Sequence, residues 1–77
     1  MNITIYSRQD CHLCEEALHY LQSKKNLIIE NIDVDSDIEL TKRFGELIPV
    51  IIIGEKTIYA PIDFIELDKL ITINAKS

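Results

Sequence analysis

Two cysteines, Cys11 and Cys14, are the residues of this chain best suited to perform chemistry. They are separated by two residues and follow a short β-rich run at residues 3–6. A pair with this spacing can exchange disulfides, bind a metal or form a structural bridge. Without an export signal in the sequence, catalysis or metal binding is favoured over a structural bridge.

The residues after the first cysteine predict an amphipathic helix. Its apolar positions recur at spacings of three and four: Leu13, Ala17, Leu18 and Leu21. Cys11 should therefore lie at the helix N-terminus, where unpaired N–H groups and the helix dipole favour a thiolate. Cys14 should lie about one turn further along, on the same side and less exposed. We therefore expect Cys11 to attack a disulfide and Cys14 to resolve the mixed disulfide.

The two neighbours of Cys11, Asp10 and His12, would have opposite effects on its thiolate. A cationic His12 would stabilise the thiolate and make the disulfide more oxidising, whereas Asp10 would oppose that effect. The alternative for His12 is an exposed residue of the first turn with little effect. For Asp10 we expect a role in satisfying the free N–H groups of the helix.

Length and composition favour one small, well-packed domain spanning residues 1–77. The chain has 77 residues, 47% of them hydrophobic, and a net charge of −5. An acidic chain without a basic stripe argues against a nucleic-acid partner. No apolar run approaches the ~18 residues of a membrane span, and no signal peptide is evident. We expect a cytoplasmic monomer that does not associate with membranes.

The chain continues with a predicted second strand and a second helix. Residues 27–29 and 32–34 form that strand, whose apolar start suggests burial on both faces, as in a parallel pair. Together with the first strand and helix it completes a right-handed βαβ unit. The next helix should be capped by Ser36, with Glu39 reaching back, and should stop at Gly45.

The last third of the chain predicts a hairpin and a final helix. Pro49 opens a strand that runs to residue 53, and a short turn at Gly54 leads into residues 57–59. Pro61 suits the first turn of the last helix. Residues 74–77 should fray. The resulting order, β-α-β-α-β-β-α, predicts an α/β fold with a four-stranded sheet and helices on both faces.

This pattern resembles the glutaredoxins of the thioredoxin superfamily over nearly the whole chain. The likeness rests on the order of elements, on Cys11 and Cys14 after the first strand, and on Ile48-Pro49 at the start of the third. The string Tyr-Ser-Arg-x-x-Cys-His-Leu-Cys, at positions 6–14, is most similar to small bacterial glutaredoxin-like proteins of the DUF836 type. The resemblance implies a thioredoxin-like fold of the glutaredoxin type, with a mixed sheet.

The same resemblance implies a thiol–disulfide oxidoreductase that acts on protein or glutathione mixed disulfides. It implies no bound cofactor, glutathione as a candidate cosubstrate, and either glutathione or a flavoprotein reductase for recycling. It also implies a cis peptide bond between Ile48 and Pro49. Pro49 would then face the cysteines and keep metal away, and the Ile48 backbone would pair with the substrate chain.

The glutathione site of the family is only partly present. Arg8 stands three positions before Cys11, where glutaredoxins carry a lysine that meets a glutathione carboxylate; the alternative is a solvated loop cation. The Gly-Gly-x-Asp-Asp segment of the family falls on residues 59–63, where Asp63 alone matches. The expected substrate-binding residues are Arg8, His12, Ile48, Pro49 and Asp63.

Two other functions remain open from the sequence. The cysteines could join His12, Glu16 and His19 at a metal, but His19 lies about 140° around the helix from Cys14, so we expect no metal ligands here. An iron–sulfur cluster bridged between two subunits is a related alternative. The second alternative is a non-catalytic module that uses the cysteine pair as a redox switch.

Overall fold

The helices and strands follow the order that the sequence predicts. The computed structural model describes residues 1–75, which form four strands, three α-helices and a short 3-10 helix, η1. The elements are β1 Asn2–Ser7, α1 His12–Gln22, β2 Ile28–Asp33, η1 Val34–Ser36, α2 Ile38–Phe44, β3 Val50–Ile53, β4 Lys56–Ile58 and α3 Phe64–Ala75. Asn74 and Ala75, which we expected to fray, complete α3, and residues 76–77 lie outside the described part.

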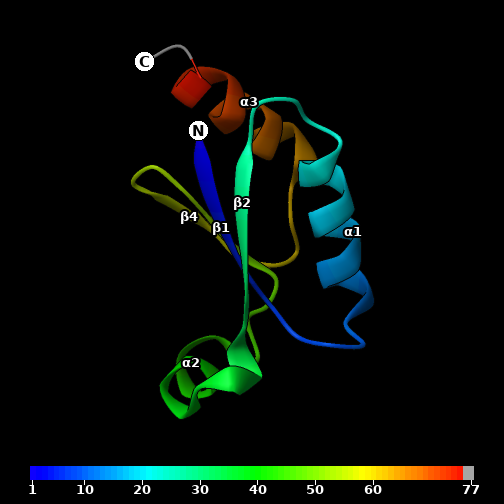
Figure 1. The fold of residues 1–77 in the computed structure, drawn as a ribbon, viewed down its shortest axis with the longest axis vertical. Coiled ribbons are helices and arrows are strands. Elements are labelled where there is room, and N and C mark those ends of the chain that lie inside the picture. The colour runs from blue at the N-terminus through cyan, green and yellow to red at the C-terminus, as the bar shows by residue number, and fades with distance from the viewer. Residues whose placement is uncertain (76–77) are drawn as a thin grey trace.

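The strands form one mixed sheet in the order β2-β1-β3-β4 (Figure 1). β1 pairs with β2 in parallel and with β3 antiparallel, and β4 returns antiparallel to β3 through a turn at Gly54, whose φ is 57°. Tyr6, near the end of β1, lies opposite Val50, the first residue of β3. The segments carrying Cys11 and Pro49 therefore leave the middle of the sheet at the same end.

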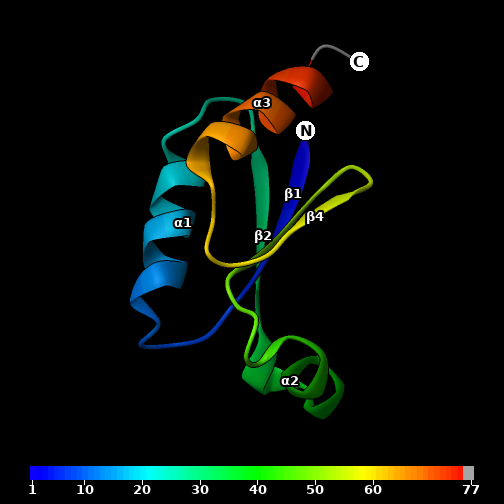
Figure 2. The same ribbon diagram turned by 180° about the vertical axis from the view of Figure 1, so that it is seen from behind.

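The larger hydrophobic core lies between the sheet and the helices α1 and α3 (Figures 1 and 2). Ile3 and Ile5 lie two positions apart on β1, so both side chains point to this face, and both are buried. They pack in one cluster with Leu21 of α1 and Leu67 of α3. Burial of each such side chain is worth roughly 1.5–3 kcal/mol, so this layer holds α1 rigidly against the sheet.

The opposite face of the sheet carries a smaller cluster around α2. Val50 of β3 is buried with Val34 of η1 and Phe44 of α2, and Tyr6 packs against them. The rings of Tyr6 and Phe44 are stacked, with centroids 4.6 Å apart. The predicted placement of helices on both faces is therefore confirmed, although α2 covers only the end of the sheet near the cysteines (Figure 2).

The expectation that the second strand is buried on both faces is wrong. β2 is an edge strand, so one side of it has no neighbouring strand. Ile28 is 68% exposed, and Ile29 and Ile32 are only half-buried. The expected parallel pairing with β1 is nevertheless correct.

Two predicted helix starts lie elsewhere. Asp37 caps α2, because its carboxylate accepts the Glu39 N–H at 2.7 Å, whereas the Ser36 hydroxyl donates to the Asp33 carbonyl at 2.6 Å. Ser36 is the last residue of η1, so the N-cap of α2 lies one residue later than predicted. Pro61 precedes α3 instead of opening it, and its peptide bond to Ala60 is cis.

Candidate active site

Cys11 and Cys14 are joined by a disulfide at the N-terminus of α1, with Cα atoms 5.2 Å apart. Cys11 is the N-cap residue, and its Sγ accepts a hydrogen bond from the Cys14 N–H at 3.2 Å. The Glu15 N–H donates to the Cys11 carbonyl at 3.0 Å and begins the helical ladder. The expected position of Cys11 at the helix start is confirmed, and its sulfur takes the place of a capping oxygen.

Asp10 turns the chain into α1 and does not act as its cap. Its φ of 58° lies in the left-handed region, which aspartate tolerates better than most residues. The side chain that accepts from the first turn belongs to Cys11. Our expectation for Asp10 is therefore wrong, because the left-handed turn puts Cys11 in the N-cap position.

The two cysteines differ in exposure. Cys14 is 2% exposed, whereas Cys11 is only partly buried. Between them, His12 is exposed and Leu13 is 56% exposed. The sulfur of Cys11 is therefore the more accessible one to a substrate, and the exposed apolar side chain of Leu13 lies beside it.

The Ile48-Pro49 peptide bond is cis, as expected from the resemblance. Pro49 is buried, and the Ile48 N–H donates to the Phe44 carbonyl at 3.1 Å. Leu47 donates to the same carbonyl at 2.8 Å. The N–H of Ile48 thus has a partner at the end of α2, so a substrate chain that used this group would have to displace that hydrogen bond.

A small groove lies on the Leu13 side of the disulfide. It encloses about 100 Å³ and is mostly apolar, with Glu16 at its border. Its other lining residues are Leu13, Pro49, Ala60, Pro61, Ile62 and Phe64. The second cis bond, Ala60-Pro61, shapes the loop on its far side. The sequence did not predict this cis bond, since a proline near a helix start is also compatible with the first helical turn.

A hollow of about 290 Å³ lies on the other side of α1, against the buried Cys14, and most of the residues that line it are polar or charged. It is bordered by Arg8 and Asp33 and by the Ser7 hydroxyl, which donates to the Asn31 side-chain oxygen at 2.5 Å. Ser7 is 8% exposed, so this bond satisfies a buried hydroxyl. The two sides of the cysteine pair therefore differ in the residues that line them, mostly apolar on the Leu13 side and mostly polar or charged on the Arg8 side.

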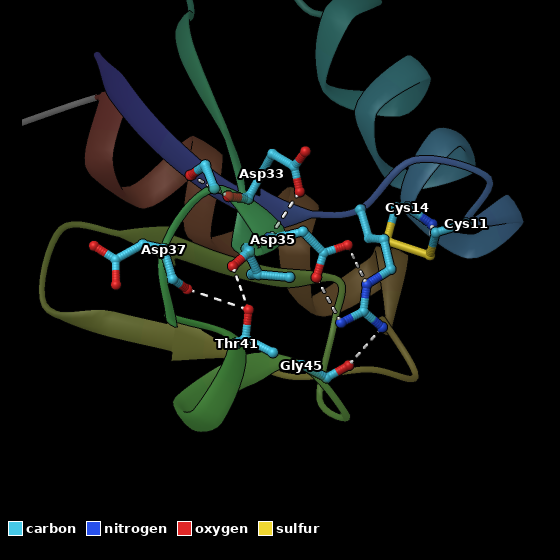
Figure 3. Close-up of polar contacts among 10 residues, drawn as sticks. Cys11, Cys14, Asp33, Asp35, Asp37, Thr41 and Gly45 are labelled. Atoms are coloured by element: carbon cyan, nitrogen blue, oxygen red, sulfur yellow. Dashed lines mark hydrogen bonds and ion pairs between the residues drawn. A yellow bond between two sulfur atoms is a disulfide. The ribbon is translucent and has the colours of Figure 1, made fainter. Parts of the chain in front are cut away.

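Arg8 is held by two residues far from it in the sequence, Asp35 and Gly45. Its Nε and Nη2 donate to the two carboxylate oxygens of Asp35 at 2.9 and 3.0 Å, and Nη1 donates to the Gly45 carbonyl at 3.2 Å. Figure 3 shows these contacts together with the Cys11–Cys14 disulfide. The hydrogen bond to the Asp35 carboxylate raises the pKa of Arg8 above its ordinary value. Arg8 is therefore not a simple solvated loop cation.

Two other expected binding residues, Asp63 and His12, lie at the N-terminal ends of helices α3 and α1. Asp63 lies at the start of α3, where its carboxylate accepts the N–H groups of Ile65 and Glu66 at 2.9 and 3.2 Å. His12 lies on the exposed first turn of α1. Contacts of Arg8, His12, Ile48, Pro49 and Asp63 with a substrate stay predictions.

The sequence of residues 2–72 matches the profile of the glutaredoxin-like domain family, DUF836. The chain belongs to this family. The glutaredoxin-like domain is also similar to the structural genomics target protein XcR50 from X. campestris, with a TM-score of 0.79 and 26% identity over 92% of this chain and 96% of that one. A mutant of the thioredoxin-like protein BC3987 shares the fold, with a TM-score of 0.72 and 23% identity over 90% and 97% of the two chains. No curated protein matches the chain significantly.

The described part of the glutaredoxin-like domain lacks two further features. Among residues 1–75, no three side chains of His, Cys, Asp or Glu are grouped so that they could hold a metal ion. Over the same residues, no helix has the length and apolar character that crossing a membrane requires.

Proposed function

We propose that this glutaredoxin-like domain is a dithiol thiol–disulfide oxidoreductase that acts on disulfides of proteins or peptides. The observation that carries the proposal is the asymmetric pair at the helix N-terminus. The accessible sulfur of Cys11 accepts an N–H of the first turn, and the buried Cys14 lies within bonding distance. An N–H donor and the helix dipole favour the thiolate over the thiol, and the thiolate is the form that attacks disulfides.

The reaction takes place in two exchanges. The Cys11 thiolate attacks one sulfur of the substrate disulfide, forms a mixed disulfide and releases the other sulfur as a thiolate, which takes up a proton. Cys14, after losing its proton, attacks the Cys11 sulfur and releases the second substrate thiolate. The substrate gains two electrons and two protons, and the domain is left with the Cys11–Cys14 disulfide.

The apolar groove beside Leu13 supports a protein or peptide as the substrate. Its lining includes Leu13, two positions after the accessible Cys11, together with Pro49, Pro61 and Phe64, which suit an aliphatic or aromatic side chain near the substrate cysteine. Since the Ile48 N–H already donates to Phe44, we infer that side-chain packing in the groove contributes more to docking than backbone pairing does.

Turnover needs an external reductant for the Cys11–Cys14 disulfide. A second dithiol, supplied by a flavoprotein reductase or its carrier, would reverse the two exchanges and return the pair to dithiol form. We therefore propose a reducing compartment, such as the cytoplasm, as the place of action.

Coupled assays test the proposal. The domain is supplied with a disulfide-bonded model protein and recycled either by thioredoxin reductase or by glutathione with glutathione reductase, while oxidation of the nicotinamide cofactor is followed. We expect reduction of the model protein by at least one route, and loss of that activity in Cys11→Ser. Failure of the fully reduced domain to reduce any protein or small-molecule disulfide would contradict the proposal and favour a redox-switch module.

A further inference from the structure

Arg8 is the cation placed between the cysteine pair and the basic end of α2. It borders the hollow that also reaches Cys14, and it borders a second hollow of about 680 Å³ together with Lys42 and Arg43. A guanidinium in such a position can bind a carboxylate through two parallel hydrogen bonds. The end of the molecule near the disulfide therefore contains a guanidinium that can bind a carboxylate-bearing thiol or disulfide, with the carboxylates of Glu15 and Asp33 in the lining of the first hollow.

The structure fills that site with a carboxylate of the chain itself. Asp35 occupies both Nε and Nη2 of Arg8, in the two-point geometry that a ligand carboxylate would adopt. Asp35 is in turn held by the η1 turn, where its N–H donates to the Asp33 carboxylate at 2.9 Å. The side chains of Arg8 and Asp35 remain 36% and 49% exposed, so a ligand in solution can reach the pair and compete.

The third guanidinium nitrogen of Arg8 also donates a hydrogen bond. Nη1 donates to the carbonyl of Gly45, which has no side chain between α2 and the guanidinium. A Cβ at this position would lie 3.3 Å from Nη2 and 2.5 Å from the Thr41 carbonyl oxygen. The end of α2 is thus fitted closely around Arg8, and the guanidinium is oriented toward Asp35.

We propose that Asp35 is a specificity-determining residue, an internal carboxylate that occupies Arg8 and weakens the binding of low-molecular-weight thiols and disulfides that carry carboxylates. The inference rests on the proposed disulfide exchange at Cys11 and names the class of substrate that this site disfavours. A tethered carboxylate acts at an effective concentration on the order of millimolar or above, so it suppresses a weak ligand present at similar concentration. Removal of the Asp35 charge frees Arg8 for the ligand.

Binding tests the inference without any need for turnover. The oxidised domain is titrated with S-methylglutathione, which carries the carboxylates of glutathione but cannot exchange disulfides. We expect Asp35→Asn to bind it about five-fold more tightly than the wild type, the change that corresponds to a surface ion pair at the upper end of its usual range. The double variant Arg8→Gln with Asp35→Asn should lose this gain in affinity. Added salt should reduce the gain in affinity that the single variant Asp35→Asn shows.

The control variant is Glu55→Gln in the β3–β4 turn, which changes the net charge equally at the far end of the sheet and should leave the affinity unchanged. In parallel, reduced wild type and Asp35→Asn are compared with oxidised glutathione and with the neutral hydroxyethyl disulfide. Each reaction yields two small thiols and the Cys11–Cys14 disulfide. Asp35→Asn should raise the second-order rate constant for oxidised glutathione relative to that for the neutral disulfide, and its reaction with the neutral disulfide shows that the variant is folded.

The results separate the two proposals. Equal affinity of wild type and Asp35→Asn for S-methylglutathione, or an equal gain in Glu55→Gln, would overturn the role of Asp35 while leaving disulfide reduction by Cys11 intact. Tighter binding by Asp35→Asn without reduction of any disulfide would support the role of Asp35 and contradict the proposed reaction.

Discussion

The backbone N–H of Cys14 donates to the Sγ of Cys11 at 3.2 Å, so the two cysteines are linked by a hydrogen bond as well as by the disulfide. One helical turn therefore supplies the donor for the first sulfur and also the second sulfur of the pair. This arrangement makes the roles of the two residues unequal, and that inequality can be measured.

Substitution of each cysteine separates attack from resolution. Cys11→Ser should show no turnover above the uncatalysed rate, because the accessible sulfur is lost. Cys14→Ser should still attack but should accumulate a mixed disulfide with the substrate, which mass spectrometry detects as a covalent adduct on Cys11. An adduct of similar yield on Cys14 in the Cys11→Ser variant would show that the assigned roles are wrong.

A matched pair of isoleucine variants tests the position of β2 at the sheet edge. Ile5→Val should lower the free energy of unfolding by about 0.5–1.5 kcal/mol, because Ile5 is buried between the sheet and the helices α1 and α3. Ile28→Val should change it by less than about 0.5 kcal/mol, because that side chain is 68% exposed. Urea unfolding at constant pH measures both values, and equal losses would contradict the edge position.

Gly45→Ala should destabilise the end of α2. The new Cβ would lie 2.5 Å from the Thr41 carbonyl oxygen, so the chain must shift, at a cost of about 1–3 kcal/mol in the free energy of unfolding. The neighbouring exposed residue provides the control, since Glu46→Ala should change the stability by less than about 0.5 kcal/mol. Wild-type stability in Gly45→Ala would show that this end of α2 adapts readily.

The contact between α1 and α3 should make stability depend on pH. Lys24 Nζ lies 3.0 Å from an Asp68 carboxylate oxygen and 4.8 Å from the centre of the Tyr20 ring. Hydrogen bonds from Tyr20 and Lys24 lower the pKa of Asp68 below its ordinary 3.8. The hydrogen bond to Asp68 is the main cause of a raised pKa of Lys24, and burial is the main cause of a raised pKa of Tyr20.

The signs of these shifts define two pH windows. The Asp68 carboxylate stabilises the fold above its ordinary pKa, and this contribution is lost as the pH falls below about 3.8. The contributions of protonated Lys24 and Tyr20 are present at neutral pH and are lost as the pH rises through their raised pKa values. Asp68→Asn should therefore be less stable than wild type at pH 7, with a difference that shrinks below pH 3.8 in urea unfolding; a constant difference would contradict this assignment.

Features that depend on neighbours in the chain were predicted well. The spacing of Cys11 and Cys14, the helical period after them and the turn at Gly54 depend on short-range geometry, which the order of residues specifies directly. The cis bond before Pro49 was expected through the family resemblance and is present. The same short-range rules misplaced one helix cap by a single residue. Ser36 and Asp37 are both good caps, but the Ser36 hydroxyl donates to the Asp33 carbonyl within η1, and Asp37 caps α2.

The sequence by itself therefore determined the order of elements, the family and the place of the cysteine pair at the first helix start. The tertiary structure alone decided that β2 lies at the sheet edge and that Arg8 is bound by Asp35, which is 27 positions away. The chain contains several other carboxylates, and nothing in their spacing distinguishes the one that meets Arg8. That choice depends on how β1, η1 and the end of α2 meet in space, and so does the substrate preference that we assign to Asp35.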